Sequence, residues 1–336
     1  MPRFVKVLVC VSTERGEQAV REKLARILAP GGVAELVTVI EPFSWYSRLL
    51  GSASDLADKL LADARARLES QAGALRQLGL NVDVRVLQGK RSLELTRAVV
   101  EGHHDLVLKE ADDDRPGLLG LSDIRVIRSC PAPVWIFRPT EGPCRVLAAV
   151  NPREEGEGEH YDPFGLSDRV EPSSMQDPIR ENALNRRILD LAAWATSLGE
   201  GTLHVAHAWR VPGEERLRQN PHVDAADVNQ YVDTIRGESE ARFKALVDDF
   251  DRGRTPVVRH LEKGWAAETI EALVERERIS LLVMGSVART GIAGYVIGNT
   301  AESLLGRIRC SVLAIKPEGF VSPVAGGRDP AQHAAD

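Results

Sequence analysis

The chain has 336 residues, of which 43% are hydrophobic and 27% are charged, and its formal net charge at pH 7 is −6. This composition is typical of a folded globular protein and excludes a mainly disordered chain, while the acidic balance argues against an extended nucleic-acid-binding surface. The length predicts two domains of about 140 to 170 residues each.

The beginning of the chain and its cysteines indicate a cytoplasmic protein. Residues 1–6 lead straight into an apolar segment and lack the sections of a signal peptide, and no apolar run is long enough to span a membrane. The four cysteines are dispersed and lack the spacing of a disulfide framework or a metal site. We expect reduced thiols, no structural metal and no membrane contact.

The first half of the chain alternates apolar runs with segments of helical periodicity. The expected strands are residues 5–11, 33–40, 81–87, 105–108 and 133–137. The expected helices are residues 17–28, 55–78, 92–100 and 124–128. Strands that alternate with helices predict an α/β fold, in which a parallel sheet carries helices on both faces.

The same order of elements recurs in the second half, which indicates an internal repeat. Residues 145–150 (RVLAAV) repeat the first strand and place Asn151 where Ser12 stands. Residues 202–209 and 256–261 repeat the second and third strands. The chain is therefore predicted to be a tandem of two similar domains.

Domain limits follow from the repeat. We expect a first domain at residues 1–140 and a second at residues 141–317. A segment rich in Glu, Gly, Asp, Ser and Pro, residues 152–178, is expected to form an inserted acidic loop in the second domain. Residues 318–336 are small and polar, and are expected to form a flexible tail.

A glycine loop in the second domain is the strongest candidate for a functional site. The apolar run 281–284 stops at Gly285, small residues follow, and Gly298-Asn299-Thr300 opens a segment of helical spacing. Free N–H groups and the positive end of a helix dipole attract anions, and glycines let a phosphate approach the backbone closely. This pattern favours a phosphate-binding loop.

The spacing of this loop resembles a family motif. Gly285, two residues, Ala288, nine residues, then Gly298-Asn299 is similar to the G-x2-G-x9-G-[ST] nucleotide loop of the universal stress protein family. Residues 260–264 (HLEKG) and the first-domain segment 109–135 also resemble tandem members of this family. The resemblance covers nearly the whole chain. It implies two Rossmann-like domains with parallel strands in the order 3-2-1-4-5, a stress-linked cytoplasmic role, and ATP, with Mg²⁺, as a ligand of the second domain.

The resemblance also assigns nucleotide-binding residues. They are Asn151, Gly285, Ser286, Ala288, Gly298, Asn299 and Thr300. Three of these positions depart from the family pattern, because Ala288 replaces a glycine, Asn299 replaces Ser or Thr, and Asn151 replaces an acidic residue. An alanine held at positive φ costs about 1 kcal/mol, and an amide cannot help to hold a metal ion as a carboxylate would.

The first domain is expected to bind no nucleotide. Its fourth strand leads into Lys109, Glu110 and the acidic run 112–114, and carboxylates at this point would repel a polyanion. The acidic run is expected to be a solvated turn. His204 and His207 lie three apart on a predicted strand, so we expect two separately packed histidines.

Three functions remain open from the sequence. The leading hypothesis is a non-catalytic stress-response protein whose second domain binds an adenine nucleotide or a related small ligand. An ATP-hydrolysing or nucleotidyl-transferring α/β enzyme is the first alternative, and only Arg289 and Glu302 lie near the loop to support it. The second alternative is a scaffold that binds an amphipathic ligand or a protein partner through the long helices at 55–78 and 225–249.

The last strands of the two domains are expected to pair. An uncovered edge strand is a liability that pairing removes. We expect residues 133–137 and 311–316 to lie antiparallel, with Trp135 buried, and to join the domains as an intramolecular pseudo-dimer. Further oligomers remain open.

Overall fold

A computed structural model of the chain describes most of its residues. These are residues 4–41, 53–112, 118–139, 142, 144–152, 178–199, 201–250, 256–286, 288–289, 296–297 and 299–326. The chain divides into two compact units. The first unit comprises Met1–Gly142, Arg309–Lys316 and Phe320–Asp336, and the second unit comprises Pro143–Ile308 and Pro317–Gly319.

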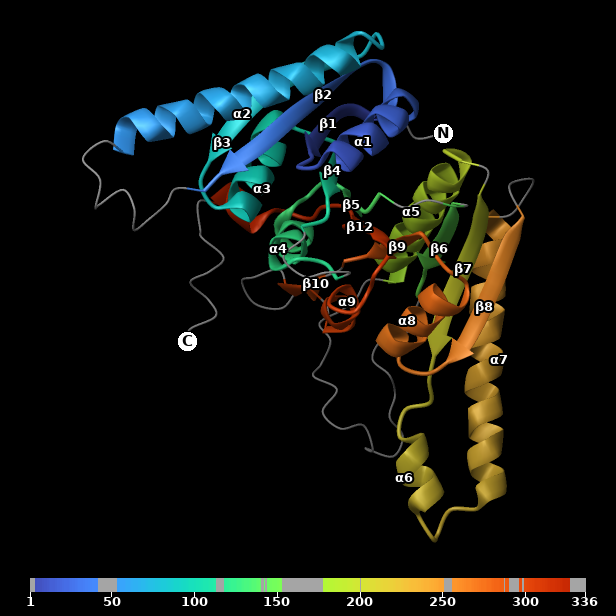
Figure 1. The fold of residues 1–336 in the computed structure, drawn as a ribbon. Helices are drawn as coiled ribbons and strands as arrows, with labels where there is room; N and C mark the ends of the chain where they lie inside the picture. The colour runs from blue at the N-terminus through green and yellow to red at the C-terminus, as the bar shows by residue number, and fades with distance from the viewer. Residues whose placement is uncertain are drawn as a thin grey trace. The chain divides into compact units, whose positions relative to one another are not determined.

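The first unit contains a parallel sheet of the predicted topology (Figure 1). Its strands are β1 (Phe4–Cys10), β2 (Leu28–Ile40), β3 (Asn81–Gln88), β4 (Leu106–Glu110) and β5 (Val134–Phe137). They lie in the order β3-β2-β1-β4-β5, and every neighbouring pair is parallel. The 3-2-1-4-5 order is therefore confirmed. Every residue of β4 and β5 is buried, as expected for central strands of a sheet that is covered on both faces.

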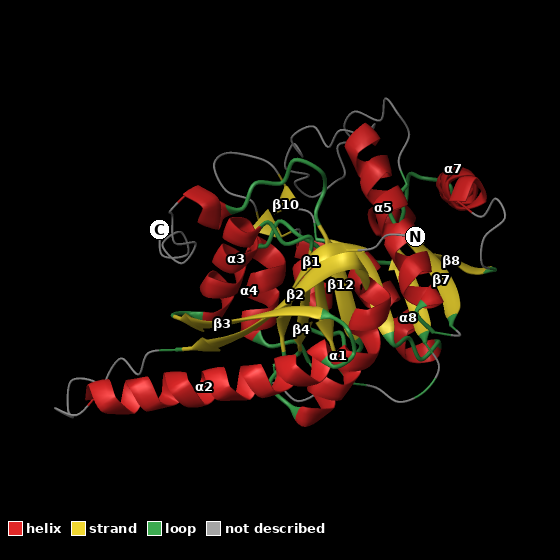
Figure 2. Cartoon of the chain, turned by 90° about the horizontal axis from the view of Figure 1, so that it is seen from above, coloured by secondary structure: helices red, strands yellow, loops and turns green. Residues whose placement is uncertain are grey.

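Helices cover both faces of this sheet. They are α1 (Glu14–Ile27), α2 (Ala53–Arg76), α3 (Arg91–Gly102) and α4 (Leu121–Ser129). Figure 2 shows α1 and α2 on one face and α3 and α4 on the other, as right-handed crossovers require for this strand order. Helix α1 begins where the Thr13 hydroxyl accepts a hydrogen bond from the Gly16 N–H, and Val20, Leu24 and Ile27 are buried on its inner side.

The fourth strand ends two residues later than the sequence pattern suggested. Lys109 and Glu110 continue β4 and pair with Ile136 and Phe137 of β5. Only 1% of Lys109 and 7% of Glu110 is exposed. Two charged residues therefore end a buried strand, because their charged groups find partners inside the first unit.

A sixth strand of the first unit comes from the far end of the chain. Strand β12 (Ser311–Ile315) lies antiparallel to β5, with Leu313 opposite Trp135 and Ala314 opposite Val134. Trp135 is 5% exposed. The predicted antiparallel pairing and the burial of Trp135 are confirmed.

The chain beyond β12 also contacts the first unit. A short 3-10 helix, η2 (Pro323–Gly326), packs against α3, and Ser322 is buried. The Lys316 ammonium lies 4.7 Å from the Phe320 ring centroid. The rest of the predicted tail, residues 327–336, lies outside the described residues.

The second unit repeats the first four strands. They are β6 (Arg145–Ala149), β7 (Thr202–Trp209), β8 (Val257–Lys263) and β9 (Leu281–Gly285), in the parallel order β9-β6-β7-β8. Its helices are α5 (Pro178–Ser197), α6 (Glu214–Gln219), α7 (Ala225–Phe250), α8 (Ala266–Arg276) and α9 (Asn299–Leu305). Two short strands, β10 (Ala288–Arg289) and β11 (Val296–Ile297), form an antiparallel pair.

The helices of the second unit also pack on its sheet. Helix α5 packs on β6 and β9, while α7 and α8 pack on β7. Most of the predicted acidic insertion, residues 153–177, lies outside the described residues. None of the helices within the described ranges combines the length and the apolar character needed to cross a membrane.

Candidate functional site

The carboxyl edge of the second unit's sheet brings two of the predicted site segments together. Ala149 of β6 pairs with Met284 of β9. Asn151 and Ser286 each lie two residues beyond that pair, so they reach the same edge of the sheet. Asn151 is exposed, whereas Ser286 is 1% exposed. This is the edge at which open α/β sheets bind ligands.

Gly285, the last residue of β9, is covered by helix α5. A Cβ atom at this position would lie 2.9 Å from Cδ2 of Leu184, which is closer than carbon atoms pack. The absence of a side chain at Gly285 therefore lets α5 pack over the end of β9. Any larger residue at position 285 would force the Leu184 side chain to shift.

The glycine loop itself is described in part. Ala288 pairs with Ile297 in the antiparallel ribbon of β10 and β11, which brings the two ends of the loop together. Asn299 and Thr300 are the first two residues of α9. Gly298 lies outside the described residues.

Asn185 of α5 is a residue of this edge that the sequence patterns did not reveal. Its Nδ2 donates to the Asn151 carbonyl at 2.8 Å, and its Oδ1 accepts from the Asn151 N–H at 3.0 Å. Only 2% of Asn185 is exposed. The available signal was a single amide on the apolar side of a helix, between Leu184 and Ile188. A neutral side chain thus holds the backbone at the end of β6.

The first unit holds the corresponding backbone with a carboxylate. Oε2 of Glu110, at the end of β4, accepts hydrogen bonds from the backbone N–H groups of Ser12 at 2.8 Å and Thr13 at 3.0 Å. The Thr13 hydroxyl donates to the other carboxylate oxygen. A Cβ atom on Gly16 would lie 2.6 Å from Oε1 of Glu110, so this glycine makes room for the carboxylate. The Glu110 carboxylate therefore occupies the anion-binding position at the N-terminus of α1.

Lys109, next to Glu110, has a buried ammonium group that binds residues of the segment after β4. Nζ of Lys109 lies 2.6 Å from Oδ1 of Asp123, 2.7 Å from Oδ1 of Asp112 and 2.9 Å from the Glu110 carbonyl. Arg91 pairs with Asp112 at 3.0 Å. Burial alone would lower the pKa of Lys109, but the attraction of Asp123 and Asp112 outweighs it and raises the pKa.

The expectation of a solvated acidic turn is therefore wrong for Asp112, whose carboxylate is 12% exposed and takes part in two ion pairs. Its two acidic neighbours, Asp113 and Asp114, lie outside the described residues. The acidic run suggested a solvated turn because the predicted strand ended at Leu108. In the structure, the strand continues through Lys109, and the Lys109 ammonium group attracts Asp112.

The histidines of β7 have separate surroundings, as expected. Nδ1 of His204 lies 3.0 Å from Nε2 of His260, and the two rings stack. Nδ1 of His207 lies 3.2 Å from the Val150 carbonyl, and burial lowers the pKa of His207 to about 4. Within the described ranges, no group of three or more His, Cys, Asp and Glu side chains could hold a metal ion.

Comparisons with known proteins identify the family of the chain. Residues 3–138 and 178–316 match the universal stress protein family. Universal stress protein E of Escherichia coli strain K12 is 28% identical over 335 residues, which cover 96% of this chain and 98% of that protein. Universal stress protein E of Photorhabdus laumondii is 25% identical over 345 residues, covering 98% of this chain and 100% of that protein.

Two solved structures share the fold over nearly the whole chain. A putative universal stress protein from Pseudomonas aeruginosa UCBPP-PA14 has a TM-score of 0.56 and 20% identity, and covers 94% of each chain. A universal stress protein from Archaeoglobus fulgidus DSM 4304 has a TM-score of 0.51 and 16% identity, over 93% of this chain and 98% of that one. The chain therefore belongs to the universal stress protein family, with two copies of the family's α/β fold in tandem.

Proposed function

We propose that this protein is a cytoplasmic, non-catalytic stress-response protein whose second unit binds an adenine nucleotide, ATP with Mg²⁺, while its first unit binds none. The observation that carries the proposal is the difference between Glu110 and Gly285, which end equivalent strands of the two units. The sequence motif of the glycine loop and membership of the family support it.

Strand register establishes that these two residues are equivalent. Cys10 of β1 pairs with Lys109 of β4, and Ala149 of β6 pairs with Met284 of β9. One residue further along, Glu110 in the first unit corresponds to Gly285 in the second. An acidic side chain and a glycine thus occupy the same point of the fold.

The electrostatic consequence differs between the units. In the first unit, the backbone N–H groups of Ser12 and Thr13 already bind the Glu110 carboxylate, and a phosphate would have to displace it. In the second unit, Gly285 brings no charge, and the neutral amide of Asn185 holds Asn151. An incoming phosphate meets no strand-end carboxylate there.

The proposed site combines backbone and short polar groups. Asn151 would hydrogen-bond the ribose, and the loop would surround the phosphates with Gly285, Ser286, Ala288, Gly298, Asn299 and Thr300. Small residues and N–H donors near a helix start supply a phosphate with hydrogen bonds at close approach.

Calorimetric titration of the full chain with ATP and Mg²⁺ tests this assignment. Gly298→Val is expected to abolish binding, because a branched side chain would block access to the loop backbone, and Ala288→Gly is expected to tighten it. Ser303→Ala is the matched control, since Ser303 is an exposed residue later in α9 and should leave affinity unchanged. ATP binding to Gly298→Val with wild-type affinity would overturn the proposal. Measuring phosphate release in the same samples distinguishes binding from hydrolysis.

A further inference from the structure

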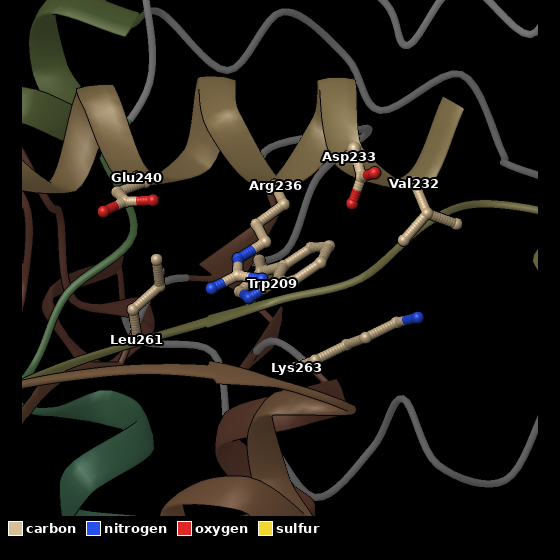
Figure 3. Close-up of a pocket in the computed structure, with 7 residues that line it drawn as sticks. All are labelled: Trp209, Val232, Asp233, Arg236, Glu240, Leu261 and Lys263. Atoms are coloured by element: carbon tan, nitrogen blue, oxygen red, sulfur yellow. The ribbon is translucent and has the colours of Figure 1, made fainter. Parts of the chain in front are cut away.

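The second unit contains an open cavity beside helix α7. Its volume is about 460 Å³, and helix α7 forms one wall while β7 and β8 form the other (Figure 3). Its lining includes Trp209, Asp233, Arg236, Glu240, Leu261 and Lys263. The volume is within the range of small-molecule sites, and the cavity shares no residue with the proposed nucleotide site.

The sequence of α7 explains why this cavity forms. Val228, Phe243 and Val247 are buried where the helix packs on the sheet. Between them, the same side of the helix carries the exposed Arg236 and the small Ser239. Neither fills the space over the sheet as an apolar side chain would, so the helix and the sheet remain apart at this point.

An aromatic side chain provides the base of the cavity. Trp209 ends β7 and is 8% exposed. Nζ of Lys263 lies 5.7 Å from the centre of the Trp209 ring and pairs with the Glu214 carboxylate, at 2.8 Å to Oε1 and 2.7 Å to Oε2. Lys263 therefore already has a carboxylate partner, which it shares with Arg218, and the small exposed part of the indole gives the base of the cavity an apolar patch.

Three charges at the wall of the cavity lack such neutralisation. Arg236, Asp233 and Glu240 form no ion pair with any residue in the described ranges. Figure 3 shows the Arg236 side chain extending from α7 toward Trp209, with Asp233 and Glu240 on either side of it. A guanidinium group can bind a carboxylate through two parallel hydrogen bonds, and a carboxylate accepts hydrogen bonds from an ammonium group.

We propose that this cavity binds a small zwitterion that carries an aromatic ring, of the chemical class of the aromatic amino acids. The carboxylate of the ligand pairs with Arg236, its ammonium group pairs with Asp233 or Glu240, and its ring packs against Trp209 and Leu261. Each charged group of the ligand then has a partner of opposite charge. A simple anion or cation would pair with only one sign of charge at this wall. The binding is independent of the nucleotide site.

Calorimetric titration of the full chain with phenylalanine tests the proposal. Arg236→Gln is expected to weaken phenylalanine binding by about tenfold or more, because a charge-assisted pair is lost. Lys244→Gln is the matched control, since Lys244 lies on the same helix, is exposed, and pairs with Asp248. Thermal unfolding of both variants verifies that they fold, and Arg236→Gln should bind ATP as the wild type does.

Two analogues isolate the charges. Phenethylamine lacks the carboxylate and 3-phenylpropionate lacks the ammonium group, so each is expected to bind more weakly than phenylalanine. The proposal is overturned if phenylalanine produces no binding at millimolar concentrations, if Arg236→Gln binds it as the wild type does, or if either analogue binds as well as phenylalanine. A loss of ATP binding alone would contradict only the nucleotide site.

Discussion

At the scale of single residues, charged side chains in the interior distinguish the two units. Lys109 and Asp123 are fully buried in the first unit, where each neutralises the other. At the equivalent point of the second unit, Met284 is a neutral apolar residue. A buried ion pair adds little stability by itself, but removal of one partner leaves an uncompensated charge.

Lys109→Met is therefore expected to lower the free energy of unfolding by about 3 to 5 kcal/mol. The methionine fills similar space, so the loss reports the unpaired carboxylate of Asp123 and not a cavity. Urea unfolding at pH 7 provides the measurement, with Lys59→Met on an exposed side of α2 as the control, which should change stability by less than about 0.5 kcal/mol. Equal stability of the two variants would contradict the role given to Lys109.

His207 makes stability depend on pH. Burial lowers the pKa of His207 from 6.5 to about 4, so between these values the unfolded chain binds a proton that the folded chain does not. Stability contributed by this histidine is therefore complete above pH 6.5 and is lost as pH falls toward 4. Between pH 7 and pH 5 the loss amounts to about 2 kcal/mol.

His207→Phe removes this titration and packs a ring of similar size beside Phe243. Urea unfolding of wild type and variant at pH 7 and pH 5 compares the two losses. His204 and His260 also have lowered pKa values because of burial, and they contribute the same loss to both proteins. The difference between wild type and variant therefore isolates His207. Identical losses in the two proteins would show that His207 is not held neutral.

At the scale of elements, the start of α1 depends on the carboxylate that ends β4. Gly16 lies where a Cβ atom would collide with Glu110, whereas a Cβ atom on Gly73 in α2 would meet nothing within 4 Å. Both residues lie in helices, where alanine is more favourable than glycine by about 1 kcal/mol. The same substitution should thus act in opposite directions.

Gly73→Ala is expected to stabilise the protein by about 0.5 to 1 kcal/mol. Gly16→Ala is expected to destabilise it by about 1 to 3 kcal/mol, since the Glu110 carboxylate must leave the N–H groups of Ser12 and Thr13. Thermal unfolding of the two variants gives the comparison. A rise in stability for Gly16→Ala would mean that the carboxylate does not determine the start of α1.

Most elements could be predicted because their signals are local. A run such as residues 281–284 is apolar throughout, which is typical of a strand buried on both faces. The end of β4 could not be predicted, because Lys109 and Glu110 are polar and their partners are distant. Glu110 binds a backbone 98 residues earlier in the chain, at Ser12. Only the folded chain reveals that these charges are satisfied.

Around the candidate site, the helix that follows the glycine loop could be predicted, whereas the nucleotide-binding residues stay a prediction. The sequence indicated that Gly298-Asn299-Thr300 opens a helical segment, and α9 begins at Asn299. Asn185 escaped prediction because an amide within a helix has no periodic signal. The cavity over Trp209 could not be predicted from the sequence, because it depends on how α7 packs against β7 and β8.

At the scale of the whole molecule, two copies of one fold have different strand ends. The first unit carries its own carboxylate against the N-terminus of α1, and it also takes β12 as a sixth strand. The second unit ends its equivalent strand in glycine and continues into the glycine loop. We infer that the first copy serves structure and the second copy serves binding.

Native mass spectrometry of the full chain with ATP and Mg²⁺ tests this division of roles most directly, because it counts ligands on each molecule. We predict one ATP per chain in the wild type and none in Gly298→Val. Ser303→Ala, the control in α9, should again carry one. Two ATP molecules per wild-type chain, or one ATP retained by Gly298→Val, would contradict the assignment of nucleotide binding to the second unit alone.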